Sequence, residues 1–208
     1  MMRASVILLA PALLGGCISL LPEPPPPPRT YVLEARDVQQ LPGAPVDAVV
    51  GVAEPGGERA LLGPDLVWRT SDTIAFVAQS QWSNRASDAL QQILTETIAR
   101  QGRFRASTRA GEARADYEIR WEVLDFEVRE EDMKAHFVAD VRLVTHGRRI
   151  VASQIVAAEA PVADRSSSIA AQALARAARE GSARIGEFAA NAAAAAAADQ
   201  ANAASINR

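Results

Sequence analysis

Cysteine and histidine are scarce in this sequence, which has one cysteine, Cys17, and two histidines, His136 and His146. A single cysteine excludes an internal disulfide bond and any zinc site built from several cysteines. Neither histidine has a second histidine or a cysteine at metal-ligand spacing. A glycine-rich phosphate loop and a Gly-x-Ser-x-Gly motif are also lacking. These absences favour a protein that is not an enzyme and that uses no metal or cofactor.

An excess of charge of either sign is also lacking, since 22 lysines and arginines face 25 aspartates and glutamates for a net charge of -3. Nucleic-acid-binding proteins usually carry a basic patch or stripe, so this composition argues against a nucleic-acid partner. The apolar run of residues 6–14 is shorter than the roughly 20 residues that a membrane-spanning helix needs. The length and the 49% hydrophobic content fit one folded domain with terminal extensions.

The first 16 residues have the organisation of a secretory signal peptide, with Arg3 followed by the short apolar run. The run ends in a sequence that resembles a bacterial lipobox: Leu14, Gly15, Gly16 and Cys17. Small residues allow the extended chain to enter a peptidase cleft, and a cysteine thiolate is the nucleophile that accepts a diacylglycerol group. Cleavage after Gly16 would make Cys17 the lipidated first residue. The alternative is a chance cysteine behind an ordinary signal peptide.

Residues 17–29 combine this cysteine with a proline-rich spacer, because Pro22 and residues 24–28 are prolines. Proline fixes φ and lacks an amide donor, so the run favours a stiff polyproline II segment between the anchor and the domain. A proline-rich ligand for another protein is the alternative. By similarity to lipoprotein sorting in Gram-negative bacteria, Ile18 in place of aspartate favours the periplasmic face of the outer membrane.

Residues 30–190 predict a single α+β domain, in which an antiparallel or mixed sheet carries two helices on one face. Alternating apolar residues indicate the strands, and a 3.6-residue period indicates the helices. Asn84 or Ser83 is the expected N-cap of the first helix and Gly102 its C-terminal stop. The expected strands are 31–33, 46–53, 73–82, 117–123 with a bulge near Asp125, 135–143 and 149–158; the expected helices are 83–101 and a second one that begins at 164–168.

The alanine-rich residues 191–208 predict a frayed or disordered tail, and Gly181 is a candidate kink in the second helix. His136 is expected to face solvent from its strand, and His146 to lie in a turn. The acidic residues 130–132 are more typical of a solvated hairpin loop than of a cation site. Ser166, Ser167 and Ser168 fit helix capping rather than nucleophilic chemistry.

Residues 60–70 are apolar and aromatic and are interrupted by Gly63 and Pro64. Tryptophan and arginine are common anchors of protein interfaces, so the candidate partner-binding residues are Leu66, Trp68 and Arg69. The alternative is that Leu66 and Trp68 only close one end of the core.

The order of these features is similar to that of the ABC-type transport auxiliary lipoproteins, outer-membrane components that accompany MCE-domain lipid transport systems. The resemblance extends from Tyr31 to Phe188 and depends on order and spacing rather than on one signature. The features that carry it are the lipobox and proline spacer before residues 31–33, the valine-rich strand before Pro55, residues 61–69, Trp82 before the helix with Leu90, Leu94 and Ile98, and the last helix with Ile169, Leu174 and Ile185.

The resemblance implies an accessory that helps to move phospholipid or other hydrophobic molecules between the inner and outer membranes. The partners that the resemblance implies are an MCE-domain protein and the permease and ATPase of the same transport system. The resemblance leaves open whether the chain forms a homo-oligomer. Two other hypotheses remain at this point. One is an envelope assembly lipoprotein that serves lipopolysaccharide or outer-membrane proteins, and the other is a lipid-anchored periplasmic enzyme, for which the sequence offers no convergent polar site.

Overall fold

The computed structural model describes residues 26–206, so residues 1–16 of the predicted signal peptide, Cys17 and most of the spacer lie outside the described part. The described chain forms one mixed sheet and two helices, as the α+β prediction requires. The strands are β1 (Arg29–Tyr31), β2 (Val46–Val52), β3 (Gly56–Gly57), β4 (Asp65–Thr70), β5 (Thr73–Trp82), β6 (Phe104–Arg109), β7 (Tyr117–Arg129), β8 (Lys134–Thr145) and β9 (Ile150–Pro161). The helices are α1 (Ala86–Gln101) and α2 (Ser167–Ile206).

The long strand β7 organises the sheet. Along one edge it pairs with β8 in antiparallel register, and β8 pairs in the same way with β9. Three short strands share its other edge in succession, β2, β3 and β4, and all three run parallel to β7. Beyond them lie β6 next to β2, β5 next to β4, and β1 next to β5. Short loops join β7, β8 and β9, and short loops favour antiparallel neighbours. The parallel pairs of β2, β3 and β4 with β7 instead join strands that are far apart in the sequence.

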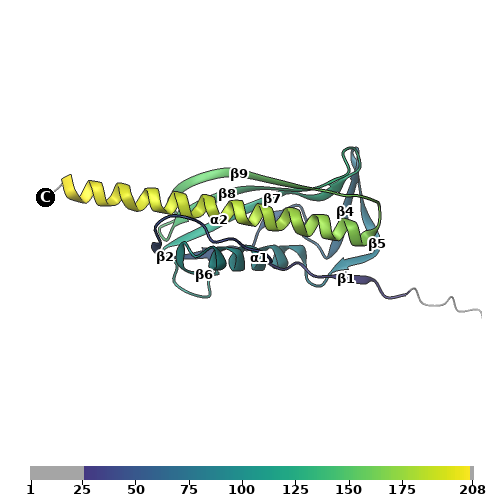
Figure 1. The fold of residues 1–208 in the computed structure, drawn as a ribbon, viewed down its shortest axis with the longest axis horizontal. Coiled ribbons are helices and arrows are strands. Elements are labelled where there is room, and N and C mark those ends of the chain that lie inside the picture. Colours follow the sequence, from purple (N-terminus) through teal and green to yellow (C-terminus); the bar gives the residue numbers. More distant parts are fainter. Residues whose placement is uncertain (1–25, 207–208) are drawn as a thin grey trace, which may run out of the picture.

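The helices α1 and α2 lie side by side over one face of this sheet (Figure 1). Between the layers, the ring of Phe126 stacks on Trp82 at 5.9 Å between centroids and meets Phe137 edge-on at 6.3 Å. The predicted bulge near Asp125 is present, because the β7–β8 register shifts between Val123 and Asp125. The extra residue turns Phe126 inward, and this completes the aromatic part of the core.

The start of α1 differs from the prediction. The helix begins at Ala86 after Arg85, and no side chain caps it. Ser83 instead continues the sheet, since its amide donates to the carbonyl of Tyr31. The first amides of α1 are satisfied by the backbone of residues 62–63, so a tertiary contact replaces the expected side-chain cap. The predicted stop is correct, because Gly102 adopts the left-handed conformation at φ 71°.

The expectation of a frayed or disordered tail beyond residue 190 is wrong, since α2 continues without interruption to Ile206. Ala189, Ala190 and Ala193 are fully buried, because small side chains allow the helix to approach the sheet closely. Gly181 also lies within the continuous helix, and its role is packing: a Cβ atom there would lie 2.2 Å from Cδ1 of Phe137. The last turns of α2 extend past the sheet (Figure 1).

Candidate partner-binding surface

The three candidate residues lie on β4 in different environments. Leu66 is fully buried and belongs to the core, so its side chain is not available to a partner of the folded domain. Trp68 and Arg69 are partly exposed. They point to opposite faces of the β4–β5 hairpin, because successive side chains of a strand alternate. The structure therefore keeps Trp68 and Arg69 on the surface and separates them.

Trp68 forms a wall of a surface pocket of about 430 Å³. The other lining residues are Thr70, Val77, Glu130 and Arg165. The indole Nε1 donates to Oε2 of Glu130 at 2.6 Å, and the other oxygen of Glu130 pairs with Arg165. These bonds hold the indole in one orientation beside a charged pair. An apolar wall with a polar rim is a combination typical of protein-binding surfaces.

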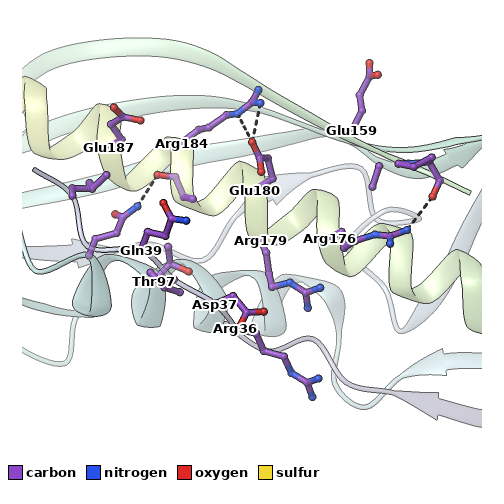
Figure 2. A pocket seen from close by; sticks show the side chains of 16 residues that line it. Arg36, Asp37, Gln39, Thr97, Glu159, Arg176, Arg179, Glu180, Arg184 and Glu187 are labelled. Atoms are coloured by element: carbon purple, nitrogen blue, oxygen red, sulfur yellow. Dashed lines mark hydrogen bonds and ion pairs between the residues drawn. The ribbon is translucent and has the colours of Figure 1, made fainter.

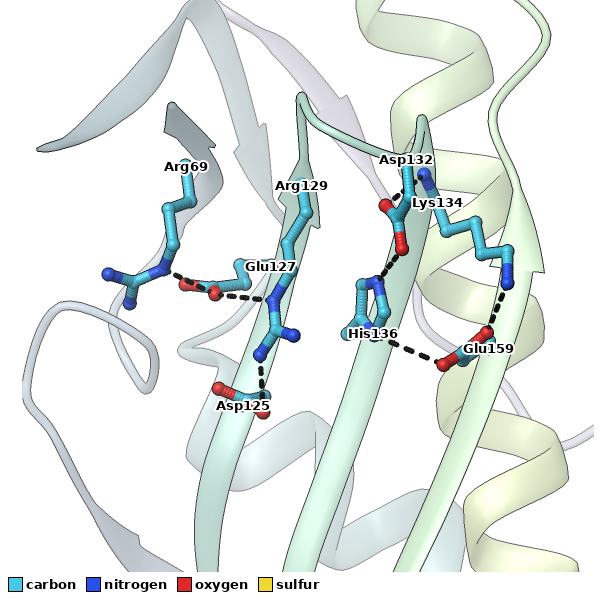
Figure 3. Close-up of polar contacts among 8 residues, drawn as sticks. All are labelled: Arg69, Asp125, Glu127, Arg129, Asp132, Lys134, His136 and Glu159. Atoms are coloured by element: carbon cyan, nitrogen blue, oxygen red, sulfur yellow. Dashed lines mark hydrogen bonds and ion pairs between the residues drawn. The ribbon is translucent and has the colours of Figure 1, made fainter. Parts of the chain in front are cut away.

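Arg69 is bound to a buried carboxylate on the other face of the hairpin. Its Nε donates to Oε1 of Glu127 at 2.5 Å, and Nε of Arg129 approaches the same oxygen at 3.3 Å (Figure 3). Arg129 also reaches Asp125 at 2.7 Å. Glu127 is fully buried, and its hydrogen bond raises the pKa of Arg69 above the usual value. Arg69 therefore compensates the charge of the buried Glu127. This is a structural role within the folded domain, and it engages the guanidinium without a partner.

The prediction that His136 faces solvent is wrong, although the residue does lie on the face opposite the core. The imidazole is only 6% exposed, because the side chains of Asp132 and Glu159 cover it (Figure 3). Its Nε2 lies 2.9 Å from Asp132 Oδ2, and its Nδ1 lies 3.5 Å from Glu159 Oε1. Desolvation acts to raise the pKa of Asp132, but its interactions with His136 and Lys134 together outweigh this effect, so the pKa is lowered.

The acidic loop of residues 130–132 is bound to its surroundings more tightly than the sequence suggested. Glu130 bonds Trp68, Asp132 contacts His136, and Glu131 accepts a hydrogen bond from the amide of Ser71. Backbone amides, including that of Ser71, lower the pKa of Glu131. Throughout residues 26–206, no group of three histidine, cysteine, aspartate or glutamate side chains could hold a metal ion. The loop therefore fastens the β7–β8 hairpin to the β4–β5 hairpin.

A larger depression of about 820 Å³ lies where residues 36–41 cross α2 (Figure 2). Its charges are balanced, and several are engaged by protein groups. Arg184 donates to the carbonyl of Ala157 at 2.5 Å and Arg176 to that of Pro161 at 3.1 Å, so α2 covers outward carbonyls of β9. The charged lining residues are Arg36, Arg176, Arg179 and Arg184 with Asp37, Glu159, Glu180 and Glu187.

Burial lowers the pKa of Arg179, and the positive charge of Arg36 adds to this effect. In the described part of the chain, no helix is both long and apolar enough to span a bilayer.

The structure defines a one-domain α+β protein with a helical layer on one face and a tryptophan-lined pocket beside the β4–β5 hairpin. The chain belongs to the family of ABC-type transport auxiliary lipoprotein components, whose model matches residues 31–186. This confirms the resemblance found in the sequence. The protein is thus an auxiliary lipoprotein component of ABC-type transport in the cell envelope, and the family is not one of known enzymes.

Solved structures show the same fold. A protein of Xanthomonas campestris assigned to family DUF330 superposes with a TM-score of 0.75 at 20% sequence identity, covering 81% of this chain and 98% of that one. An uncharacterized protein superposes with a TM-score of 0.63 at 14% identity, covering 78% of this chain and 99% of its own. Comparison with curated proteins gave no match.

Proposed function

We propose that this protein is an outer-membrane lipoprotein accessory of an MCE-type ABC transport system that moves phospholipid or other hydrophobic molecules between the inner and outer membranes. The observation that carries the proposal is the family match over residues 31–186. In this proposal Cys17 carries the lipid anchor at the periplasmic face of the outer membrane. The permease and the ATPase are separate subunits, which agrees with the lack of a phosphate loop in the sequence.

The proposed docking surface for the MCE-domain partner is the Trp68 pocket. Trp68 supplies a large apolar face that is already oriented by Glu130, so little conformational freedom is lost on binding. Arg165 and Glu130 supply a charged rim that can select one partner over another. Arg69 contributes to this surface through the stability of the hairpin, since its guanidinium is engaged with Glu127.

A pull-down tests both parts. The tagged, full-length protein is recovered from detergent-solubilised envelopes, and co-purifying proteins are identified by mass spectrometry. We expect an MCE-domain protein with its permease and ATPase. Trp68→Ala should reduce recovery of the partner by about tenfold or more, because a central tryptophan of an interface commonly contributes 2 kcal/mol or more.

Ile155→Ala is the matched control, since Ile155 is 65% exposed on β9, away from the pocket, and its recovery should equal that of the wild type. Recovery of lipopolysaccharide-assembly or barrel-assembly proteins instead would support an envelope assembly lipoprotein and contradict the proposal. Full recovery with Trp68→Ala would leave the transport role intact but remove the pocket as the docking surface.

A further inference from the structure

The outer edge of β5 is open along most of its length. The strand β1 pairs with β5 only at Ser80, Gln81 and Trp82. Among the described residues, the part of β5 before Ser80 has β4 as its only strand neighbour. The chain itself prevents a longer β1, because Pro26, Pro27 and Pro28 precede it and proline has no amide to donate to a ladder.

This open edge is uncharged and apolar, which is unusual for a sheet edge. Residues 73–82 include no charged side chain, and Phe76 is 54% exposed. Ile74 and Phe76 lie on one face of the hairpin, and Ala75 and Val77 lie on the other. The β9 edge is treated differently, since Arg176 and Arg184 cover its carbonyls. Natural edges are normally protected by charge, proline or a covering segment, so the β5 edge is available for a contact.

The N-terminal end of the described chain is next to the same edge. The chain enters the domain at β1, directly beside β5, at the end of the molecule away from the C-terminus of α2 (Figure 1). Because β1 is parallel to β5 and Arg29 pairs with Ser80, the N-terminal end of β1 points toward the first half of β5. Residues 18–28 alone separate Cys17 from Arg29, and a chain of that length spans about 40 Å at most.

We propose that the face of β5 that carries Ile74 and Phe76 rests on the lipid surface that holds the acylated Cys17, with both side chains in the interfacial layer, while Val77 on the opposite face remains part of the Trp68 pocket. The inference rests on the proposed anchor. The tether holds this edge at a high local concentration next to lipid, whereas any protein partner must diffuse to it. Phenylalanine is among the side chains that interfacial segments bury at the boundary between headgroups and acyl chains, and the absence of charge on β5 avoids the desolvation cost that a charged strand would bear there.

A fluorescent label tests the contact. Acylation consumes the only native thiol, so Phe76→Cys introduces a single reactive thiol into the lipidated, full-length protein. The labelled protein is reconstituted into phosphatidylethanolamine–phosphatidylglycerol vesicles that contain brominated phospholipid. We expect a blue shift and at least twofold quenching of the label at position 76. Ile155→Cys, at another exposed apolar position, is the control and should show neither effect.

Ala78→Cys provides a second label position with a small, exposed side chain on the same face as Phe76, for the case in which Phe76→Cys does not fold. Equal, water-exposed signals at positions 76, 78 and 155 on vesicle-bound protein would overturn the inference and leave the transport role untouched. Protection that arises only when an MCE-domain protein is added would assign the edge to a protein partner and also overturn it. An intact-mass measurement without acyl chains on Cys17 would refute the anchor and this inference together.

Discussion

Glu127 and the arginines around it illustrate how a few residues stabilise the contact between the β4–β5 and β7–β8 hairpins. The carboxylate is fully buried on the sheet face opposite the helices, and one of its oxygens, Oε2, has no hydrogen-bond partner among the described residues. A buried carboxylate is costly unless opposite charges and hydrogen bonds compensate for the lost water. Arg69 and Arg129 provide that compensation through the other oxygen. The hairpins β4–β5 and β7–β8 are therefore joined by a charge network.

Replacing Arg69 should destabilise the fold. We expect Arg69→Met to lower the free energy of unfolding by about 1–3 kcal/mol, less than the loss of a fully buried partner because Arg129 remains and Arg69 is partly exposed. Adding Glu127→Gln should restore part of this loss. Arg105→Met is the control, since its ion pair with Asp47 is exposed and should contribute less than about 1 kcal/mol. Urea denaturation measures these three variants together with Glu127→Gln alone and the wild type, and losses of the two single changes that simply add in the double variant would contradict the coupling.

At the scale of single elements, α2 contains two different parts. Its first part packs on α1 and on the sheet, with Phe188 and Ala193 among the contacting residues, and its last turns are exposed. Alanine has high helix propensity in both parts, but only the first part gains stability from burial. The hairpin β4–β5 shows the same division, since Leu66 and Val67 are buried while Phe76 is exposed.

Truncation separates the two parts of α2. A chain that ends after residue 194 should unfold within about 0.5 kcal/mol of the full-length protein, because it loses exposed residues. A chain that ends after residue 187 should be less stable by more than about 3 kcal/mol, because it loses the buried Ala189, Ala190 and Ala193 and the half-buried Phe188 that packs against the core. Thermal and urea unfolding measure both. A large loss from the shorter deletion would mean that the exposed turns stabilise the domain.

Across the whole molecule, the features proposed to act in the envelope gather at one end. The strands β1, β4 and β5 lie at that end, and the C-terminus of α2 lies at the other (Figure 1). Trp68 of the pocket belongs to β4, and the open edge belongs to β5. Under the proposed function, this arrangement would bring a partner close to the membrane that holds the acylated Cys17. The single domain has no need to span the membrane if an acylated Cys17 holds it there.

Changing Cys17 to serine tests the anchor. We expect the Cys17→Ser protein to move from the membrane fraction to the soluble fraction, because each buried methylene of an acyl chain contributes about 0.8 kcal/mol to attachment and serine accepts none. Fractionation followed by immunoblotting measures the distribution, and sucrose-gradient separation distinguishes outer from inner membrane. A variant that stays in the membrane fraction would contradict lipid anchoring through this residue.

Local patterns in the sequence were sufficient for the α+β class, the β7–β8–β9 meander, the bulge near Asp125 and the stop at Gly102, since these depend on side-chain period and on backbone conformation. Only tertiary structure decided features that depend on distant segments. The parallel pairing of β2 and β4 with β7, the backbone cap of α1 and the burial of Glu127, His136 and Ala193 all require a partner far away in the chain. A periodic pattern predicts which face is apolar, but it does not reveal which segment covers that face.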